Sequence, residues 1–464
     1  MFKIKNKIIR DTVLLALMQI FLDSASILLN GFITRQLGAA AVGMFSLMGS
    51  FLGLVSIISS GNAFLCMSRL AAEESGRVEG NPNRVLFHGI KLCTLLSVAV
   101  SVLVIFFSET VAVRFFGEKS AETVISAIRL MPAALVSGAL SACFKGYFNA
   151  CRKATVAAIG DILEFIIKST VVVLMTLLIK NVSVYQIMIF SVISGNIFSL
   201  LFMLILFARH KNKDSGKKSA GTLNFRQYIC LAFPIMGGGL LTSILSSTND
   251  ALVPFCLRQS GDSTEQAFAL FGIFEAIVIP ALFFPSVILC SLSGIVVTEA
   301  ARASASDNTE KIKSMTAKLI QYTLIYAVIS AVLLILFGNR IGTALGGGKE
   351  AGRMISAIAP VVPFIYLEII LEALIKGLGL QAFSSLNYLA EYIIRISAVL
   401  ILVPHFGFTG IVISYYASNI FGNTSRLVKL LKFTEISISD FPWLSWLKFE
   451  KTVNINQKSN NKIV

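Results

Sequence analysis

The sequence has few of the residues that solvate a protein surface or carry enzyme chemistry. Only 14% of its 464 residues are charged and three are histidine, whereas 55% are hydrophobic. Soluble domains carry about 25% charged residues and disordered chains have low hydrophobicity, so both classes are excluded. The seven cysteines show no Cys-x-x-Cys spacing, which argues against a disulfide scaffold and against a metal site.

Motifs of catalysis are also missing. The chain contains no Gly-Lys-Ser/Thr phosphate-binding motif, no Gly-x-Ser-x-Gly nucleophile motif and no cluster of His, Cys and carboxylate residues. We therefore expect no enzyme activity, no cofactor and no metal site. Any transport energy would come from an ion gradient or from the membrane potential.

Long apolar runs dominate the chain instead. A helix needs about 20 apolar residues to cross a hydrocarbon core of about 30 Å. Runs of this length occur at 11–33, 42–66, 86–108, 122–144, 154–179, 183–208, 226–257, 266–298, 314–338, 352–375, 382–403 and 407–431. The sequence therefore predicts an all-α polytopic membrane protein with about twelve transmembrane helices.

The net charge of +15 is unevenly distributed among the segments between these runs. With a cytoplasmic N-terminus, the inside segments hold 28 Lys and Arg residues, the outside loops hold 8, and four lie within or at the edges of spans. This bias follows the positive-inside rule and predicts a cell-membrane protein with both termini in the cytoplasm. The charge therefore indicates topology and attraction to lipid headgroups rather than a nucleic-acid partner.

The two halves of the chain repeat one another. Residues 35–49 align without gaps on residues 258–272, with six identities in fifteen positions. Further matches follow in the same order: 125–128 with 355–358, 145–146 with 376–377, and 164–168 with 391–395. Because each half has six spans, both halves begin on the same side, so the repeat is parallel about an axis along the membrane normal.

This repeat predicts the domain organisation. We expect an N-lobe at residues 1–208, a cytoplasmic basic linker at 209–225, a C-lobe at 226–432, and an interfacial anchor with a polar tail at 433–464. The linker is the longest polar stretch in the chain. A cavity between two such lobes that opens alternately to each side is the expected mechanism.

Charged residues inside the spans are the candidates for a site. Each costs about 2.5–3.5 kcal/mol at the centre of a span, so one that is retained usually faces a cavity or a partner. The acids and bases of this kind that we consider are Asp23, Asp161, Glu164 and Lys168 in the first half, and Asp250, Glu275, Glu368, Glu372, Glu391 and Arg395 in the second.

The fifth span carries three of these residues on one face. Asp161, Glu164 and Lys168 are spaced i, i+3 and i+7, and Glu391 with Arg395 repeats the Glu–base spacing on the eleventh span. One interpretation is a self-neutralising pair that lets each helix insert and pack. The other is a cavity wall, where the base holds an anionic headgroup and Asp161 takes a proton or a cation.

The remaining acids lie in other contexts. Asp23 has no base on its own helix one turn away, which favours a cavity role, whereas local helix capping competes with such a role for Asp250. Asp23, Asp161 and Asp250 are the candidates for ion coupling. Glu368, Glu372 and Lys376 form a stripe that favours a solvated helix face.

Prolines inside spans predict hinges. Eight of the ten prolines lie in or at the edge of a span, where they kink or interrupt helices. The hinge candidates are Pro132, Pro234, Gly238, Pro280 and Pro285.

Four short sequence motifs resemble those of the stage V sporulation protein B and polysaccharide-exporter families of the multidrug/oligosaccharidyl-lipid/polysaccharide (MOP) flippase superfamily. The motifs are Thr34–Gly38, Met67–Glu74, Lys145–Asn149 with the residues from Asp161 to Lys168 downstream, and Asn249–Pro254. The resemblance implies a MATE-like fold of two six-helix lobes related by a pseudo-twofold axis along the membrane normal. It also implies a flippase that moves a lipid-linked saccharide between leaflets by alternating access.

Such a substrate carries an anionic pyrophosphate, which Arg35, Arg69, Arg258, Lys168 and Arg395 could bind. The alternative is a MATE-type multidrug antiporter that exchanges organic cations for H⁺ or Na⁺, because the spans hold eight acids against four bases. The predicted cavity residues for either function are Asp23, Arg35, Asp161, Glu164, Lys168, Asp250, Arg258, Glu275, Glu391 and Arg395. The predicted partners are the lipid bilayer, a lipid-linked saccharide or an organic cation, and H⁺ or Na⁺.

Overall fold

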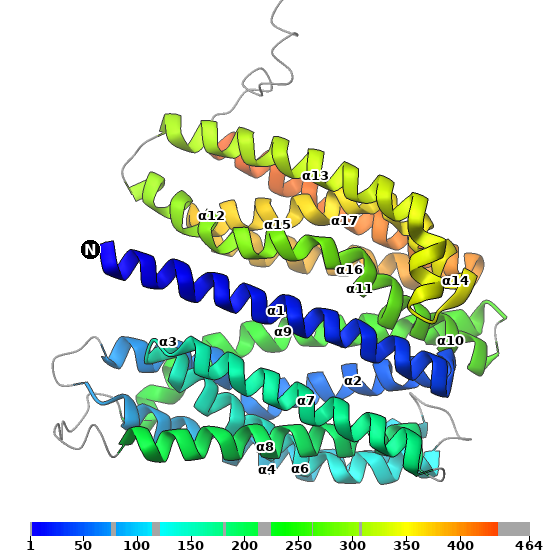
Figure 1. Ribbon diagram of the computed structural model, residues 1–464, viewed down its shortest axis with the longest axis horizontal. Coiled ribbons are helices and arrows are strands. Elements are labelled where there is room, and N and C mark those ends of the chain that lie inside the picture. The colour runs from blue at the N-terminus through cyan, green and yellow to red at the C-terminus, as the bar shows by residue number, and fades with distance from the viewer. Residues whose placement is uncertain are drawn as a thin grey trace, which may run out of the picture. The chain divides into compact units, whose positions relative to one another are not determined.

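The computed structural model describes residues 2–75, 80–113, 121–179, 182–211, 224–261, 263–305 and 309–434. Within these ranges the chain forms helices joined by short turns, and it contains no strand (Figure 1). The prediction of an all-α polytopic membrane protein is confirmed. Most of the predicted linker, and the predicted anchor with its tail beyond Thr434, lie outside the described residues.

By its internal contacts the chain divides into two compact units, residues 1–280 with 344–347 and residues 281–343 with 348–464. Unit 1 contains α1 (Phe2–Leu37), α2 (Ala39–Ser60), α3 (Ala63–Ser75), α4 (Pro82–Phe106), α5 (Ser108–Val111), α6 (Ala121–Ala150), α7 (Ala154–Leu178), α8 (Val184–Lys211), α9 (Phe225–Gln259), α10 (Thr264–Ile273) and the π-helical turn η3 (Phe274–Val278). The unit boundary falls within α11 (Ile279–Phe283). Unit 2 contains the 3₁₀ turn η4 (Phe284–Ser286), α12 (Val287–Ala305), α13 (Thr309–Ala344), α14 (Gly348–Ile358), the 3₁₀ turn η5 (Ala359–Val361), α15 (Val362–Gly377), α16 (Gln381–Phe406) and α17 (Phe408–Thr434). The predicted lobe boundary in the linker stays a prediction.

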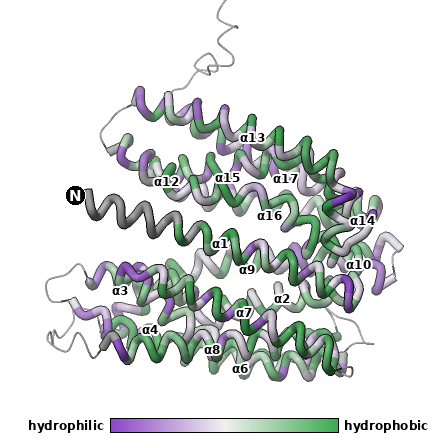
Figure 2. The backbone as a smooth tube through the Cα atoms, in the orientation of Figure 1, coloured by the Kyte–Doolittle hydropathy of each residue, from purple (hydrophilic) through white to green (hydrophobic). Residues whose placement is uncertain are grey.

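The long helices are apolar along most of their length, as Figure 2 shows. Among the described residues, ten helical segments are long and apolar enough to cross a membrane, judged by length and composition. Of the twelve predicted spans, the two without a counterpart among these ten are the helices α7 and α17, which carry charged and amide side chains. These two helices contribute to the charged clusters described below.

In unit 1, α7 and α8 pack closely because a glycine faces the contact. A β-carbon at Gly195 of α8 would lie 2.9 Å from the carbonyl oxygen of Glu164 on α7. A side chain at residue 195 would therefore push α7 away from α8. The apolar core beside this contact is formed by α3, α4 and α6, around Met67, Leu70 and Cys143.

In unit 2, α16 and α17 form a helical hairpin that turns at Gly407, whose φ of 55° favours glycine. Both helices pack with α15. A β-carbon at Gly422 of α17 would lie 2.5 Å from a carboxylate oxygen of Glu391 on α16. The missing side chain at Gly422 therefore makes room for the Glu391 carboxylate inside the hairpin.

The predicted interruption near Pro280 and Pro285 coincides with a change of helix type. The eighth span passes from α10 through η3, α11 and η4 to α12. Carbonyl groups released by this change find hydroxyl partners in unit 2: Tyr366 donates to the Leu282 oxygen at 2.8 Å and Tyr326 to the Pro285 oxygen at 2.7 Å. By contrast, α6 and α9 continue as single helices through Pro132 and Pro234, and their hinge roles stay predictions.

Candidate functional site

A cluster of four charged side chains lies between α6 and α7 in unit 1. The Lys145 Nζ of α6 lies 2.7 Å from a carboxylate oxygen of Asp161 and 2.7 Å from one of Glu164. Lys168 Nζ contacts the other Glu164 oxygen at 3.0 Å, at the spacing that the sequence predicted. We call Lys145, Asp161, Glu164 and Lys168 the unit 1 cluster.

The unit 1 cluster is most buried in its middle and more exposed at its two ends. The Lys145 side chain is 10% exposed and that of Glu164 20%, whereas Lys168 is 32% and Asp161 51% exposed. The two lysines and two carboxylates balance in formal charge. The cluster is therefore a neutral but strongly polar wall with Asp161 at its accessible edge.

This wall faces a cavity of about 580 Å³, which we call the polar cavity. Its lining comes mainly from α2, α6, α7 and α8 and includes all four residues of the unit 1 cluster. Ser56, Ser60, Ser141 and Asn196 add hydroxyl and amide groups to the wall. The Asn196 side chain is held by its bond to the Ala134 carbonyl at 3.0 Å, so part of this wall is positioned by buried hydrogen bonds.

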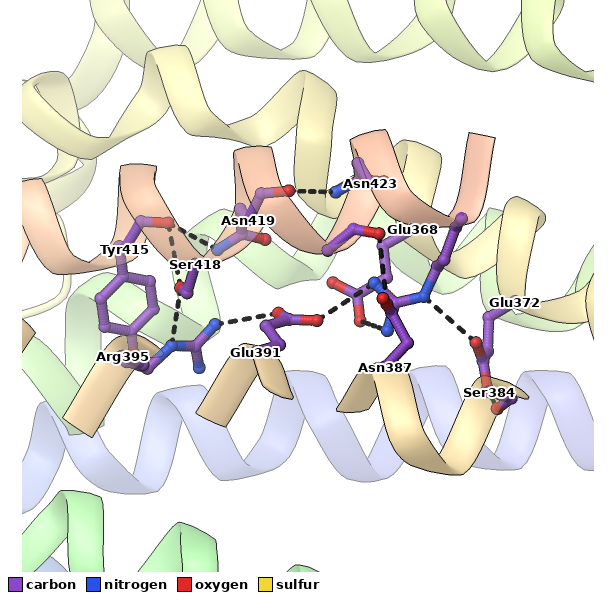
Figure 3. Close-up of polar contacts among 12 residues, drawn as sticks. Glu368, Glu372, Ser384, Asn387, Glu391, Arg395, Tyr415, Ser418, Asn419 and Asn423 are labelled. Carbon is purple, nitrogen blue, oxygen red and sulfur yellow. Dashed lines mark hydrogen bonds and ion pairs between the residues drawn. The ribbon is translucent and has the colours of Figure 1, made fainter. Parts of the chain in front are cut away.

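A second cluster lies within unit 2, where one arginine contacts three glutamates. The Arg426 guanidinium of α17 reaches Glu368 at 3.0 Å and Glu372 at 3.2 Å, both on α15, and Glu391 of α16 at 3.1 Å. Its side chain is only 1% exposed. Figure 3 shows the three carboxylates converging from α15 and α16.

The edges of this second cluster are also paired. Arg395 contacts Glu391 at 3.4 Å and donates from Nε to the Ser418 hydroxyl at 3.0 Å, while its guanidinium lies over the Tyr415 ring at 4.6 Å (Figure 3). Lys376 contacts Glu372 at 3.2 Å, and the Ser384 hydroxyl donates to the same carboxylate. We call Glu368, Glu372, Lys376, Glu391, Arg395 and Arg426 the unit 2 cluster; its three bases balance its three acids.

The two Glu–base pairs predicted from the repeat form in both units, but two of their partners were missed. The sequence places Lys145 and Arg426 among the positive residues of the inside segments, because each lies near the predicted end of a span. The structure buries both among carboxylates. The signal for Lys145 was its match with Lys376 in the repeat, whereas no sequence pattern separated Arg426 from its neighbours Lys429 and Lys432.

These positions change two expectations. Glu368 and Glu372 do not form a fully solvated helix face, because their carboxylates turn toward Arg426. The acidic excess inside the spans also nearly disappears. With Lys145, Lys376 and Arg426 added to the four predicted bases, seven bases stand against eight acids.

The other acids of the predicted site lie apart from both clusters. Asp23 accepts a hydrogen bond from Gln19 at 2.9 Å on the same helix and does not line the polar cavity. Asp250 of α9 accepts a bond from the Ser50 hydroxyl of α2, so it joins two helices. Glu275 lies in the π-helical turn η3.

The predicted arginines and the glycine hinge lie elsewhere in unit 1. Arg35 donates to the Ala344 carbonyl. Gly238 lines a cavity of about 430 Å³ together with Pro234 and Arg69. Arg258 lines a separate cavity of about 400 Å³ between α2 and α9. The structure therefore brings together Asp161, Glu164 and Lys168 in one cluster, and Glu391 with Arg395 in the other.

Comparison with known proteins places this architecture. Residues 8–297, more than half of the chain, match the family described as "Polysaccharide biosynthesis protein". The chain belongs to this family. A curated relative in sequence, stage V sporulation protein B of Bacillus subtilis (strain 168), is 20% identical over 417 residues, which cover 88% of this chain and 80% of the relative.

Two solved structures share the fold of this chain. An inward-facing multidrug resistance MATE family transporter of the MOP superfamily has a TM-score of 0.69 at 14% identity, covering 89% of this chain and 96% of the transporter. The lipid II flippase MurJ, in an inward closed conformation, has a TM-score of 0.69 at 15% identity, covering 92% of this chain and 89% of MurJ. The resemblance to the stage V sporulation protein B and polysaccharide-exporter families is thus confirmed, and the chain shares the fold of a MATE family transporter of the MOP superfamily and of a lipid II flippase.

Proposed function

We propose that this transporter moves a lipid-linked saccharide across the bilayer by alternating access, and that the polar cavity of unit 1 holds the saccharide headgroup. The observation that carries the proposal is the composition of the cavity wall. Serine and asparagine side chains line it beside two lysines and two carboxylates. Sugar hydroxyl groups both donate and accept hydrogen bonds, and such a wall offers both kinds of partner.

The charge pattern supports a saccharide over an organic cation. Both carboxylates of the unit 1 cluster have a lysine partner, so neither carries an uncompensated negative charge that would attract a cationic substrate. Among the residues that the structure describes, Lys168 has Glu164 as its one ion-pair partner, and its side chain is one-third exposed. It is the base of this cluster best placed to contact an anionic group of the headgroup.

The second candidate is an H⁺- or Na⁺-coupled antiporter of organic cations. The half-exposed Asp161 favours it, since an accessible carboxylate in a transporter can exchange a proton or a cation. Asp161 contacts Lys145, however, so a cation would have to displace that lysine. We therefore rank this function second, with Asp161 as its ion-coupling residue.

Transport in proteoliposomes separates the two functions. The first arm follows a fluorescent lipid-linked disaccharide, whose exposure to a membrane-impermeant quencher reports transfer between leaflets. The second follows efflux of a fluorescent organic cation under an imposed proton or sodium gradient. We expect protein-dependent transfer of the disaccharide lipid, reduced at least fivefold in Lys168→Ala.

Lys91→Ala is the matched control, because Lys91 also projects from a span but lies over the Phe225 ring, at 4.6 Å, rather than in the polar cavity. Gradient-driven cation efflux without transfer of the disaccharide lipid would reject the flippase and support the antiporter.

We also infer that both termini are cytoplasmic. Protease protection of tags at the two ends of the chain tests this orientation.

A further inference from the structure

Helix α2 presents two different faces to two different cavities. Gly49, Gly53 and Ser56 belong to the face that lines the polar cavity. Leu47, Phe51 and Leu54, at i, i+4 and i+7, belong to the face that lines the second cavity of about 400 Å³, which we call the α2–α9 pocket. A polar chamber and an apolar chamber therefore lie on opposite sides of one helix.

The α2–α9 pocket is apolar over most of its wall. Its lining residues are Leu47, Ser50, Phe51, Leu54, Ser247, Thr248, Ala251, Leu252, Phe255 and Arg258. Two of the hydroxyl groups already have partners: Ser50 donates to Asp250, and Ser247 donates to the Ser50 carbonyl at 3.0 Å. Most of the lining that a ligand meets is therefore hydrocarbon.

Arg258 is the one charged residue in this lining, and it is incompletely satisfied. It lies in the last turn of α9, with its guanidinium carbon 5.8 Å from the centre of the Phe255 ring. Its Nε is shielded from solvent and has no hydrogen-bond acceptor among the described residues. A buried donor without an acceptor is unfavourable, and a phosphate is the ligand that the planar guanidinium binds best.

We propose that the α2–α9 pocket binds the lipid end of the transported substrate, with its hydrocarbon chain along the apolar wall and its phosphate at Arg258. This assignment rests on the proposed flippase function. The pocket provides both parts that such a ligand needs: an apolar wall from α2 and α9, and one cation at the end of α9.

Binding of farnesyl phosphate, a short isoprenoid monophosphate, to the purified full-length protein in uncharged detergent tests the assignment without requiring transport. Radiolabelled farnesyl phosphate is the probe. Unlabelled farnesol, inorganic phosphate and phosphatidylglycerol are the competitors. We expect saturable binding, with farnesol competing at least tenfold more weakly than farnesyl phosphate and inorganic phosphate competing more weakly still.

Two substitutions separate the charge from the apolar wall. Arg258→Gln should weaken farnesyl phosphate binding at least tenfold and should make farnesol and farnesyl phosphate nearly equal as competitors. Ala251→Phe should reduce binding by filling the pocket while Arg258 is retained. Arg340→Gln is the matched control, because Arg340 also stacks on an aromatic ring one turn earlier, Phe337, at 5.8 Å, and should bind as wild type.

Several outcomes would overturn the assignment. These are unchanged affinity in Arg258→Gln, full competition by inorganic phosphate, or equal competition by phosphatidylglycerol, which would indicate a bulk-lipid site. If Arg258→Gln is poorly folded by size-exclusion chromatography, Arg258→Lys takes its place and should weaken binding by a smaller factor. Wild-type saccharide transfer with binding that is independent of Arg258 rejects the pocket alone. Binding that depends on Arg258 without any saccharide transfer rejects the proposed function.

Discussion

The unit 1 and unit 2 clusters begin from the same sequence pattern and end in different environments. In both, a glutamate and a base lie four residues apart on one helix, and a glycine on the next helix makes room for the glutamate: Gly195 for Glu164 and Gly422 for Glu391. The unit 1 cluster lines a cavity. The unit 2 cluster surrounds an arginine that is almost completely buried.

One position accounts for much of the difference. Arg426 follows Glu391 by 35 residues, and the residue that follows Glu164 by the same spacing is Ser199. Ser199 is buried and bonds to Ser141 and to the Gly160 carbonyl, at 3.1 and 3.3 Å. A short hydroxyl at this position leaves space beside the glutamate, whereas the long guanidinium fills it and recruits two further carboxylates.

The comparison teaches that a repeated charged pattern does not by itself identify a site. A Glu–base pair of this kind neutralises its own charge in both helices. The residue that a third helix places beside the pair, Ser199 in unit 1 and Arg426 in unit 2, decides whether the pair faces a cavity or is enclosed. We therefore propose that the unit 1 cluster acts in transport and that the unit 2 cluster acts in helix packing. The following predictions test that division.

The largest effect is expected for Arg426→Ser, which gives the unit 2 cluster the residue found in unit 1. Three carboxylates then lose their shared cation, and breaking a buried ion pair by removing one partner costs about 3–5 kcal/mol. Equilibrium unfolding in mixed detergent micelles measures this loss. Lys432→Ser, at an exposed position of the same helix, should stay near wild type, and adding Glu391→Gln to Arg426→Ser should recover part of the loss.

A smaller loss of stability, but a large loss of transport, is expected for Lys145→Met. Asp161 is half exposed and Glu164 keeps Lys168, so the unfolding free energy should fall by only about 1–3 kcal/mol. Transfer of the lipid-linked saccharide should fall at least tenfold, because the cavity wall acquires net negative charge. A loss of stability as large as that of Arg426→Ser would contradict the open character of the unit 1 cluster.

Lys168→Ala and Arg395→Ala each remove the base of one Glu–base pair. The first should mainly reduce transport and the second should mainly reduce stability. Lys168 is one-third exposed, so its removal should change the unfolding free energy by about 1 kcal/mol or less while reducing transport. Arg395, 13% exposed, should affect stability more than transport at matched amounts of folded protein. Wild-type transport in a well-expressed Lys168→Ala variant would reject the cavity role of Lys168.

The smallest effect is expected for Asp23→Asn, which lies outside both clusters. Its hydrogen bond with Gln19 survives the substitution, so stability should change by about 0.5 kcal/mol or less. If Asp23 couples transport to an ion, the dependence of transport on the proton or sodium gradient should weaken. Transport assays with each gradient collapsed in turn check this, and an unchanged dependence would reject Asp23 as a coupling residue.

Much of the fold could be predicted because membrane insertion constrains local sequence. Each apolar run of the required length falls on a helix or on consecutive helices, and the interruption near Pro280 and Pro285 coincides with a change in helix type. Within the candidate site, the contacts that were predictable were those on a single helix, such as Glu164 with Lys168. Such contacts follow from helical periodicity alone.

Contacts between helices were not predictable in the same way. Arg426 joins glutamates that precede it by 35, 54 and 58 residues, and Lys145 reaches Asp161 and Glu164 across a turn. In the sequence both bases resemble the positive residues that end a span at the cytoplasmic surface. Counting them with that surface produced an acidic excess, and with it a stronger case for a cation antiporter than the paired charges support.

The length of the apolar runs, their periodicity and the internal repeat therefore suffice to predict a helical membrane protein with matched charged pairs. They suffice because bilayer thickness and helix pitch constrain residues that are close together in the sequence. The tertiary structure alone separates the open unit 1 cluster from the enclosed unit 2 cluster. Whether a charged pair faces a cavity depends on the side chain that a third helix brings beside it, and helix packing, not spacing along one helix, places that side chain.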